Sequence, residues 1–244
     1  MRVPTCEMHG VQPILSGMAS PLPARASLMR LHAVSVGLPR TTTWKNRTVT
    51  TGIFKSPVAG DVQVRRLNLD GDRQADLAVH GGEDKAVYAY PLEHYAAWRE
   101  AMPGVEFTPS AFGENLTTEG LLEAEVEIGD RFRIGTAEFE AAQPRMPCYK
   151  LGIRFGRDDI VRRFVQMRAP GIYLRVRREG VLRAGAEITA LERSGSGLTV
   201  REVFDLLLSR PIAPALRERV MRAKALPSHL REHLLGEGGA EEEE

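Results

Sequence analysis

The 244-residue sequence contains few cysteines and no long apolar segment. Its two cysteines, Cys6 and Cys148, are too few for a disulfide framework, which favours a reducing compartment such as the cytoplasm. No apolar run approaches the roughly 20 residues that a membrane-spanning helix needs, so we expect no membrane segment. Lys and Arg (33) almost balance Asp and Glu (32), and this charge gives no reason to expect nucleic acid as a partner.

Signatures of several common enzyme classes are also missing. The sequence has no Walker-type phosphate loop and no nucleophile elbow around a serine. A zinc site built from His80, His94 and Cys148 is conceivable, but these three residues lack the short His-x-x-x-His spacing with which a helix binds zinc. We expect His94 to pack within a helix instead. Neither zinc chemistry nor serine chemistry is therefore favoured.

The N-terminal part of the chain predicts a mostly β domain preceded by an irregular segment. Residues 1–28 are interrupted by Pro and Gly and show little periodicity, which predicts a disordered extension or an overlong start with Met29 as the initiator. Residues 29–193 contain many short alternating stretches and few helical ones. This pattern predicts a closed or partly closed β-barrel with a few helices.

The composition changes after residue 193. Residues 194–197 read Ser-Gly-Ser-Gly and predict a flexible linker. Thr199 and Glu202 form a capping-box pattern that opens the first of three helices, so residues 198–236 predict a small three-helix appendage. Residues 237–244 predict a solvated acidic tail.

The strongest chemical signal is the segment 143–150, which reads Gln-Pro-Arg-Met-Pro-Cys-Tyr-Lys. Its two prolines stiffen the backbone around Cys148. Arg145 and Lys150 supply a positive field that is expected to lower the pKa of the Cys148 thiol, and the thiolate is the form that attacks or binds metal. A lone cysteine after a strand can equally be an inert packed side chain. The residues alone leave nucleophile, sulfur carrier, metal ligand and packing open.

Two glycine-containing loops are further candidates for a binding site. His80, Gly81 and Gly82 are followed by Lys85, and such a loop can present backbone N–H groups and a cation to a phosphate or a pterin. Asn115 ends a Phe-Gly-Glu-Asn segment, where its amide can hydrogen-bond the edge of a heterocycle. Both segments can also be ordinary loops.

Taken in order, these segments resemble the MOSC domain family. The nearest match is its YiiM-like branch, which is associated with resistance to hydroxylaminopurine. The resemblance is carried by residues 31–37, 51–55, 74–76, 79–82, 85–88, 112–116 and 143–151. It spans residues 29 to about 191, and the three predicted helices resemble the C-terminal appendage of that branch.

The resemblance implies a β-barrel that binds the molybdenum cofactor, a molybdopterin that holds one molybdenum. It implies an oxidoreductase that reduces N-hydroxylated compounds such as hydroxylaminopurine to amines, a detoxification, with a separate reductase as electron donor. Cys148 would be the catalytic residue and the molybdenum ligand. The residues expected to bind the cofactor are His80, Gly81, Gly82, Lys85, Asn115, Arg145 and Lys150.

Other roles are less well fixed by the sequence. Asp76, Glu114 and Tyr90 are candidates for supporting or proton-donating roles, although nothing in the sequence sets their distance from Cys148. A non-catalytic alternative uses the same pocket: a module that carries the molybdenum cofactor, or that carries sulfur as a persulfide on Cys148.

Overall fold

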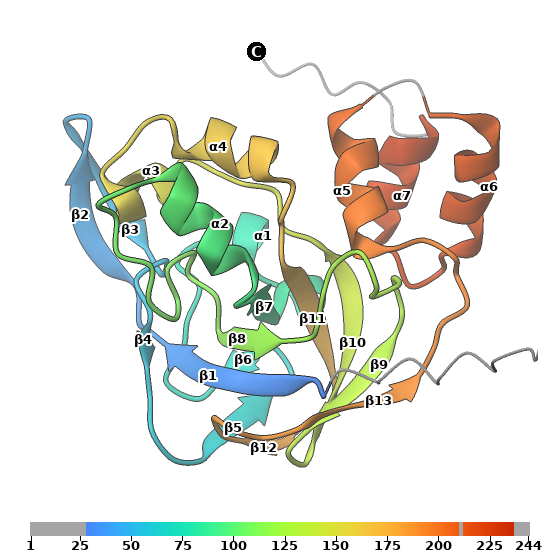
Figure 1. The fold of residues 1–244 in the computed structure, drawn as a ribbon, viewed down its shortest axis with the longest axis horizontal. Coiled ribbons are helices and arrows are strands. Elements are labelled where there is room, and N and C mark those ends of the chain that lie inside the picture. The colour runs from blue at the N-terminus through green and yellow to red at the C-terminus, as the bar shows by residue number, and fades with distance from the viewer. Residues whose placement is uncertain (1–27, 210–211, 237–244) are drawn as a thin grey trace, which may run out of the picture.

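The computed structural model describes residues 28–209 and 212–236 (Figure 1). Its strands are β1 (Arg30–Val36), β2 (Arg40–Trp44), β3 (Arg47–Thr51), β4 (Ser56–Pro57), β5 (Val62–Arg65), β6 (Asn68–Leu69), β7 (Val87–Pro91), β8 (Leu116–Glu119), β9 (Arg131–Ile134), β10 (Ala137–Pro144), β11 (Ile172–Arg178), β12 (Gly180–Leu182) and β13 (Ile188–Glu192). Its helices are α1 (Leu77–His80), the 3-10 turn η1 (Glu83–Lys85), α2 (His94–Ala101), α3 (Lys150–Phe155), α4 (Ile160–Met167), α5 (Val200–Leu208), α6 (Pro214–Arg222) and α7 (Ser228–Leu235). The interpretation of residues 1–27 as an extension or an overlong start, and the predicted tail 237–244, lie outside the described residues.

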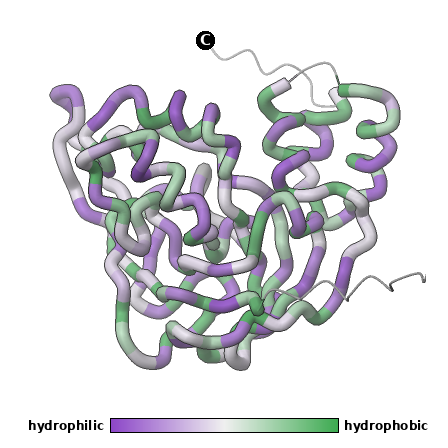
Figure 2. Tube along the Cα trace, in the orientation of Figure 1, coloured by the Kyte–Doolittle hydropathy of each residue, from purple (hydrophilic) through white to green (hydrophobic). Residues whose placement is uncertain are grey.

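Within the described residues, eight strands form one sheet in the order β13-β9-β10-β11-β7-β8-β1-β4. Neighbouring strands are antiparallel except β7 and β8, which are parallel. A three-stranded sheet in the order β12-β5-β6 lies beside it. Figure 2 shows hydrophobic and hydrophilic residues alternating along the chain, as expected where each element buries one face. The predicted mostly β class with some α is confirmed.

The large sheet curls back on itself. Leu31 of β1 donates its N–H to Ala186 O at 2.9 Å, and the N–H of Ile188 at the start of β13 donates to Met29 O at 2.9 Å. An antiparallel bridge between Arg30 and Glu187 lies between these bonds. Strands near opposite ends of the order therefore meet, which gives a partly closed barrel with only β4 beyond the junction.

Strands β2 and β3 form a β-hairpin that the sequence patterns did not single out. β2 and β3 pair from Arg40–Thr51 to Trp44–Arg47, and Lys45 and Asn46 at the tip have left-handed φ angles of 49° and 61°. This is the backbone that a two-residue hairpin turn requires. The ribbon projects from the body of the molecule (Figure 1) and its second strand ends at the pocket described below.

An aromatic cluster fills the space between the sheet and helices α2 and α4. Trp98 and Phe164 are fully buried there and lie near Phe112, with ring centroids 5.0 Å and 5.9 Å from it. Aromatic pairs at these separations add to the stability gained from burial alone. The cluster forms a rigid support beneath the loop that contains Phe112.

Helices α5–α7 form a group at one end of the molecule (Figure 1) and pack against the sheet. Thr199 and Glu202 form the predicted capping box at the start of α5. Val203, Val220 and Leu234, one from each helix, belong to the same buried cluster as the sheet residue Phe139. The three helices are therefore present as predicted, but they share the core of the barrel instead of forming a core of their own.

The prediction of a flexible linker at residues 194–197 is wrong. Ser194 N–H donates to Asp130 Oδ1 at 2.8 Å, and Gly197 N–H donates to Glu127 Oε2 at 2.9 Å. The next residue, Leu198, is completely buried. Composition alone suggested a loose Ser-Gly segment, but carboxylates distant in the sequence fix its backbone.

In residues 28–209 and 212–236, no helix combines the length and the apolar character needed to cross a membrane.

The shared core predicts that barrel and helices unfold together. Leu198→Ala should lower the free energy of unfolding by about 2–5 kcal/mol, because it leaves a cavity where the two parts meet. Unfolding in urea, followed by far-ultraviolet circular dichroism and by tryptophan fluorescence, should show one transition at one midpoint. The control Leu208→Ala removes a side chain that is 39% exposed and should change stability by less than about 1 kcal/mol. Two separate transitions would contradict the shared core.

Candidate functional site

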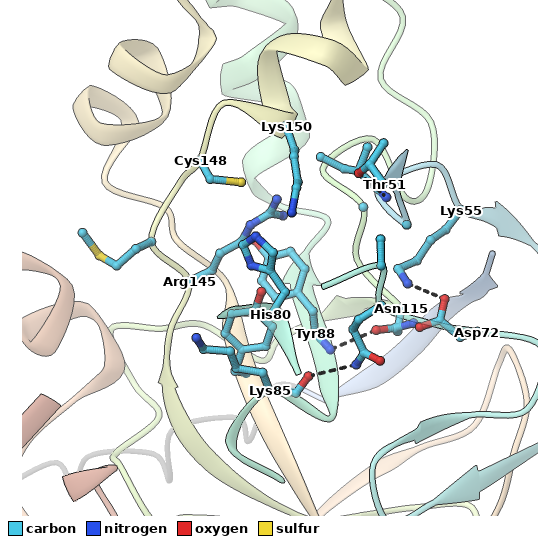
Figure 3. Close-up of a pocket in the computed structure, with 17 residues that line it drawn as sticks. Thr51, Lys55, Asp72, His80, Lys85, Tyr88, Asn115, Arg145, Cys148 and Lys150 are labelled. Atoms are coloured by element: carbon cyan, nitrogen blue, oxygen red, sulfur yellow. Dashed lines mark hydrogen bonds and ion pairs between the residues drawn. The ribbon is translucent and has the colours of Figure 1, made fainter. Parts of the chain in front are cut away.

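The pocket that contains Cys148 lies between four segments (Figure 3). Three of them follow β3, β6 and β10, and the fourth precedes β8. The empty space in it is about 650 Å³, a figure that includes open solvent at its mouth. Six of the predicted site residues line it. They are His80, Lys85, Asn115, Arg145, Cys148 and Lys150. Residues far apart in the sequence are therefore brought together as the sequence suggested.

Cys148 occupies the turn that leads from β10 into the short helix α3. Its carbonyl accepts a hydrogen bond from Leu151 N–H at 3.0 Å, which starts the helix and fixes the backbone that carries the sulfur. Cys148 is a free cysteine of intermediate exposure, so its sulfur is reachable from the pocket. An inert packed cysteine would be buried. The geometry suits a thiolate that contacts a bound group.

Arg145 is fixed inside the wall of the pocket. Its Nη1 donates to the carbonyl oxygen of Phe112, and its guanidinium lies 4.8 Å from the centre of the Tyr88 ring. Burial lowers the pKa of Arg145, but Tyr88, Tyr173 and Cys148 outweigh this effect and raise it above its ordinary value. Arg145 is therefore a permanent positive charge beside the sulfur.

His80 and Lys85 form another wall of the pocket (Figure 3). Burial, together with the charges of Lys150, Lys85 and Arg145, lowers the pKa of His80 to about 4. His80 is therefore neutral at pH 7. Burial also lowers the pKa of Lys85. The shift of His80 reflects the positive charges around it, and both shifts reflect a partly desolvated space.

Gly81 and Gly82 do not line the pocket but shape the loop beside it. A side chain at Gly81 would lie 2.8 Å from Leu77 O, and Gly82 has a φ of +89°. Each position thus needs glycine for backbone reasons. Their predicted contact with a cofactor stays a prediction.

Asn115 touches the pocket while its amide joins three strands. Its Oδ1 accepts from Tyr88 N–H at 3.2 Å, and its Nδ2 donates to Ser35 O at 3.3 Å. One amide hydrogen remains for a ligand. Asn115 therefore holds β1, β7 and the start of β8 in register. These bonds leave its second amide hydrogen as the donor that it can offer to a heterocycle.

The three residues suggested for supporting roles lie outside the residues that line the pocket. Glu114 is completely buried and organises the loop behind it. Tyr90 is buried in the aromatic cluster and accepts a hydrogen bond from Trp98 Nε1 at 2.7 Å. Asp76 accepts the N–H of His80 through its backbone carbonyl at 2.9 Å. His94, a conceivable zinc ligand, instead pairs with Glu123 at 2.8 Å.

Sequence reasoning missed an ion pair inside the pocket. Lys55 and Asp72 are paired, with side chains only 8% and 1% exposed. Asp72 Oδ1 also accepts Gly37 N–H at 3.0 Å. Burial lowers the pKa of Lys55, and the charge of Asp72 opposes this shift. Residues 51–55 carried part of the resemblance, but no local pattern indicated that Lys55 would meet a turn aspartate 17 positions later.

Comparisons with known proteins identify the family. The model of the MOSC domain matches residues 76–189. The uncharacterized protein YflK of Bacillus subtilis is 42% identical over 169 residues, which are 69% of this chain and 76% of YflK. The crystal structure of YiiM from Geobacillus stearothermophilus has 35% identity and a TM-score of 0.71, and the match covers 85% of this chain and 98% of that one. The chain belongs to the MOSC domain family, in its YiiM-like branch.

A third relative of this MOSC protein has a name that states an activity. A protein named Reductase from Gibberella moniliformis is 31% identical over 168 residues, which are 68% of this chain but only 30% of that protein. The shared part is thus a fraction of a much longer chain.

The crowded charges predict a pH-dependent response of His80. Nuclear magnetic resonance of its imidazole should give a titration midpoint near pH 4, and pyrophosphate should raise that midpoint by offsetting Lys150, Lys85 and Arg145. The unfolded chain binds this proton more tightly, so the contribution of His80 to stability is complete above about pH 6.5 and is lost as the pH falls through 4. His80→Gln assigns the signal and should flatten this loss. A midpoint near 6.5 that pyrophosphate leaves unchanged would contradict the electrostatic picture.

Proposed function

We propose that this MOSC protein binds the molybdenum cofactor through Cys148 and reduces N-hydroxylated bases of the hydroxylaminopurine type to amines. The observation that supports this most directly is a reachable cysteine sulfur in a pocket lined by four cationic side chains. Those cations are Lys55, Lys85, Arg145 and Lys150. The relative named Reductase supports an oxidoreductase over a carrier.

The residues of the pocket fit such a cofactor in charge and in donor type. A thiolate is a soft ligand of the kind that metals bound by sulfur prefer, and Cys148 supplies it. The molybdopterin is anionic in its dithiolene and its phosphate, and four cations face a single carboxylate, Asp72, among the described residues that line the pocket. Within the described residues, Asp72 Oδ2 is buried and has no hydrogen-bond partner.

The reaction converts R–NHOH, two electrons and two protons into R–NH₂ and water. The bound cofactor would supply the two-electron chemistry. Arg145 and Lys150 would hold the anionic part of the cofactor and keep the sulfur of Cys148 in a positive field. Neutral His80 can donate or accept a hydrogen bond at the pocket wall without adding charge. The electrons would come from a separate reductase.

A single substitution tests the role of the cysteine. Protein purified from cells that make the molybdenum cofactor should contain molybdenum and pterin, and Cys148→Ala should lose most of the molybdenum. With dithionite as reductant, wild-type protein should convert 6-hydroxylaminopurine to adenine, and the variant should lose at least about a hundredfold of that rate, as expected when a group essential to the chemistry is removed.

A neighbouring variant provides the control. Tyr149→Ala changes the adjacent residue, which is 54% exposed and does not line the pocket, and it should keep metal content and rate near those of wild type. Wild-type protein without molybdenum, or a Cys148→Ala variant that retains it, would overturn the assignment. Loaded wild-type protein without turnover would favour the carrier function.

A further inference from the structure

The wall of the pocket that contains Lys85 is the short turn η1, which needs contacts with other elements to keep its position. η1 has only three residues, with hydrogen bonds from Lys85 N–H to Gly82 O at 3.2 Å and from Ala86 N–H to Glu83 O at 3.4 Å. So short a helix is not stable by itself. The position of Lys85 therefore depends on contacts made by side chains from outside the turn.

Arg175 of β11 makes a charged contact to this turn. Its Nε donates to Asp84 Oδ1, and its Nη1 donates to Glu140 Oε1 at 2.8 Å. The Arg175 side chain is only 11% exposed, so solvent screens these bonds little. Asp84 is the residue immediately before Lys85. A guanidinium with several donors in a fixed plane can hold such a set of acceptors at once, which an ammonium cannot.

The same guanidinium reaches the C-terminal helices. Arg175 Nη1 also donates to Ala225 O at 2.7 Å, in the connection between α6 and α7. His229 in the first turn of α7 lies close enough to Lys85 and Asp84 for their charges to act on it, although burial is the main cause of its lowered pKa. One side chain thus links the helical group, the sheet and the turn.

Three other side chains among the described residues also contact η1. Arg66 Nε donates to Glu83 Oε1 at 2.9 Å, and two glutamine amides contact the backbone of the turn. Gln143 Nε2 donates to Asp84 O at 3.2 Å, and Gln74 Nε2 donates to Lys85 O at 3.5 Å. Arg175 differs in that it also donates to the connection between α6 and α7. It therefore connects these two helices to the turn that carries Lys85.

We propose that Arg175 is a positioning residue through which helices α6 and α7 hold the Lys85 wall of the pocket in place for an anionic ligand. The identity of that ligand rests on the proposed function, but the coupling between helices and wall does not. The C-terminal group is then part of the binding site, because its contact with Arg175 sets where Lys85 lies.

Hydrogen–deuterium exchange on the full chain without cofactor tests this coupling directly. Arg175→Met should speed exchange of the Lys85 and Ala86 amides by about tenfold or more, since it removes hydrogen bonds to a charged group. Arg177→Met is the matched control, because Arg177 lies on the same strand and shares Glu140 but makes no hydrogen bond to Asp84 or Ala225 O. Arg168→Met is a second control that removes a different contact between barrel and helices, the one to Asp205.

Local exchange separates positioning from general destabilisation. Faster exchange in the turn of Arg175→Met alone supports the proposal, whereas no change there, or the same change in Arg177→Met, overturns it. If Arg175→Met fails to fold, Arg175→Lys and Asp84→Asn replace it. Each keeps a polar group but weakens the charged Arg175–Asp84 contact, and each should give a local change in the same direction.

A second experiment tests whether the position of this wall affects ligand binding. After expression in cells that make the cofactor, Arg175→Met should retain severalfold less pterin per protein than Arg177→Met. Equal pterin content despite a loosened turn would overturn the claim that the wall positions Lys85 for the ligand. If wild-type protein contained no pterin, the proposed function would be rejected. The positioning role of Arg175 would still be tested by the exchange experiment, which uses protein without cofactor.

Discussion

Much of the pocket depends on one completely buried carboxylate, Glu114. It accepts hydrogen bonds from Ser110 N–H at 2.8 Å, from Phe112 N–H at 3.0 Å and from Thr117 Oγ1 at 3.2 Å, and the Tyr95 hydroxyl donates to it as well. Burial raises the pKa of Glu114, and these donors counteract the effect by stabilising the charged form. A buried carboxylate without such partners would be strongly unfavourable, so the loop must wrap around it. Glu114 was a candidate for a supporting or proton-donating role, and its hydrogen bonds hold the loop behind the pocket.

The fold of that loop places several other groups at once. Phe112 turns its carbonyl towards Arg145, and Gly113, with a φ of +77°, passes so close to Ile53 that a side chain there would lie 2.8 Å from Ile53 Cγ1. Asn115 then binds β1 and β7. Because one short segment determines the place of Arg145, the cavity edge and the strand register, disruption of Glu114 would disturb stability and binding together. The aromatic cluster beneath Phe112 supplies the rigidity that such a segment needs.

Sequence patterns predicted the features that depend on residues close together in the chain. They failed for the features that depend on contacts between distant residues. The capping box at Thr199 involves residues within a few positions and was predicted correctly. The segment 143–150 is equally local, and it places Cys148 at the pocket. The β2–β3 hairpin was missed because neither of its faces is strongly apolar, so hydrophobic alternation gave no signal. The linker at 194–197 was misjudged because Glu127 and Asp130 hold it across more than 60 residues. No short-range pattern reveals such partners.

The pocket also shows why binding and folding should be linked in this protein. Lys55 and Lys85 have lowered pKa values, with burial as the first cause, so each positive charge is held where water stabilises it poorly. Lys55 is partly compensated by Asp72, but the charge of Arg145 repels it. An anion that enters the cavity removes this repulsion only in the folded state. Its binding free energy therefore adds to the stability of the fold, and the same crowding that weakens the empty protein favours an anionic ligand.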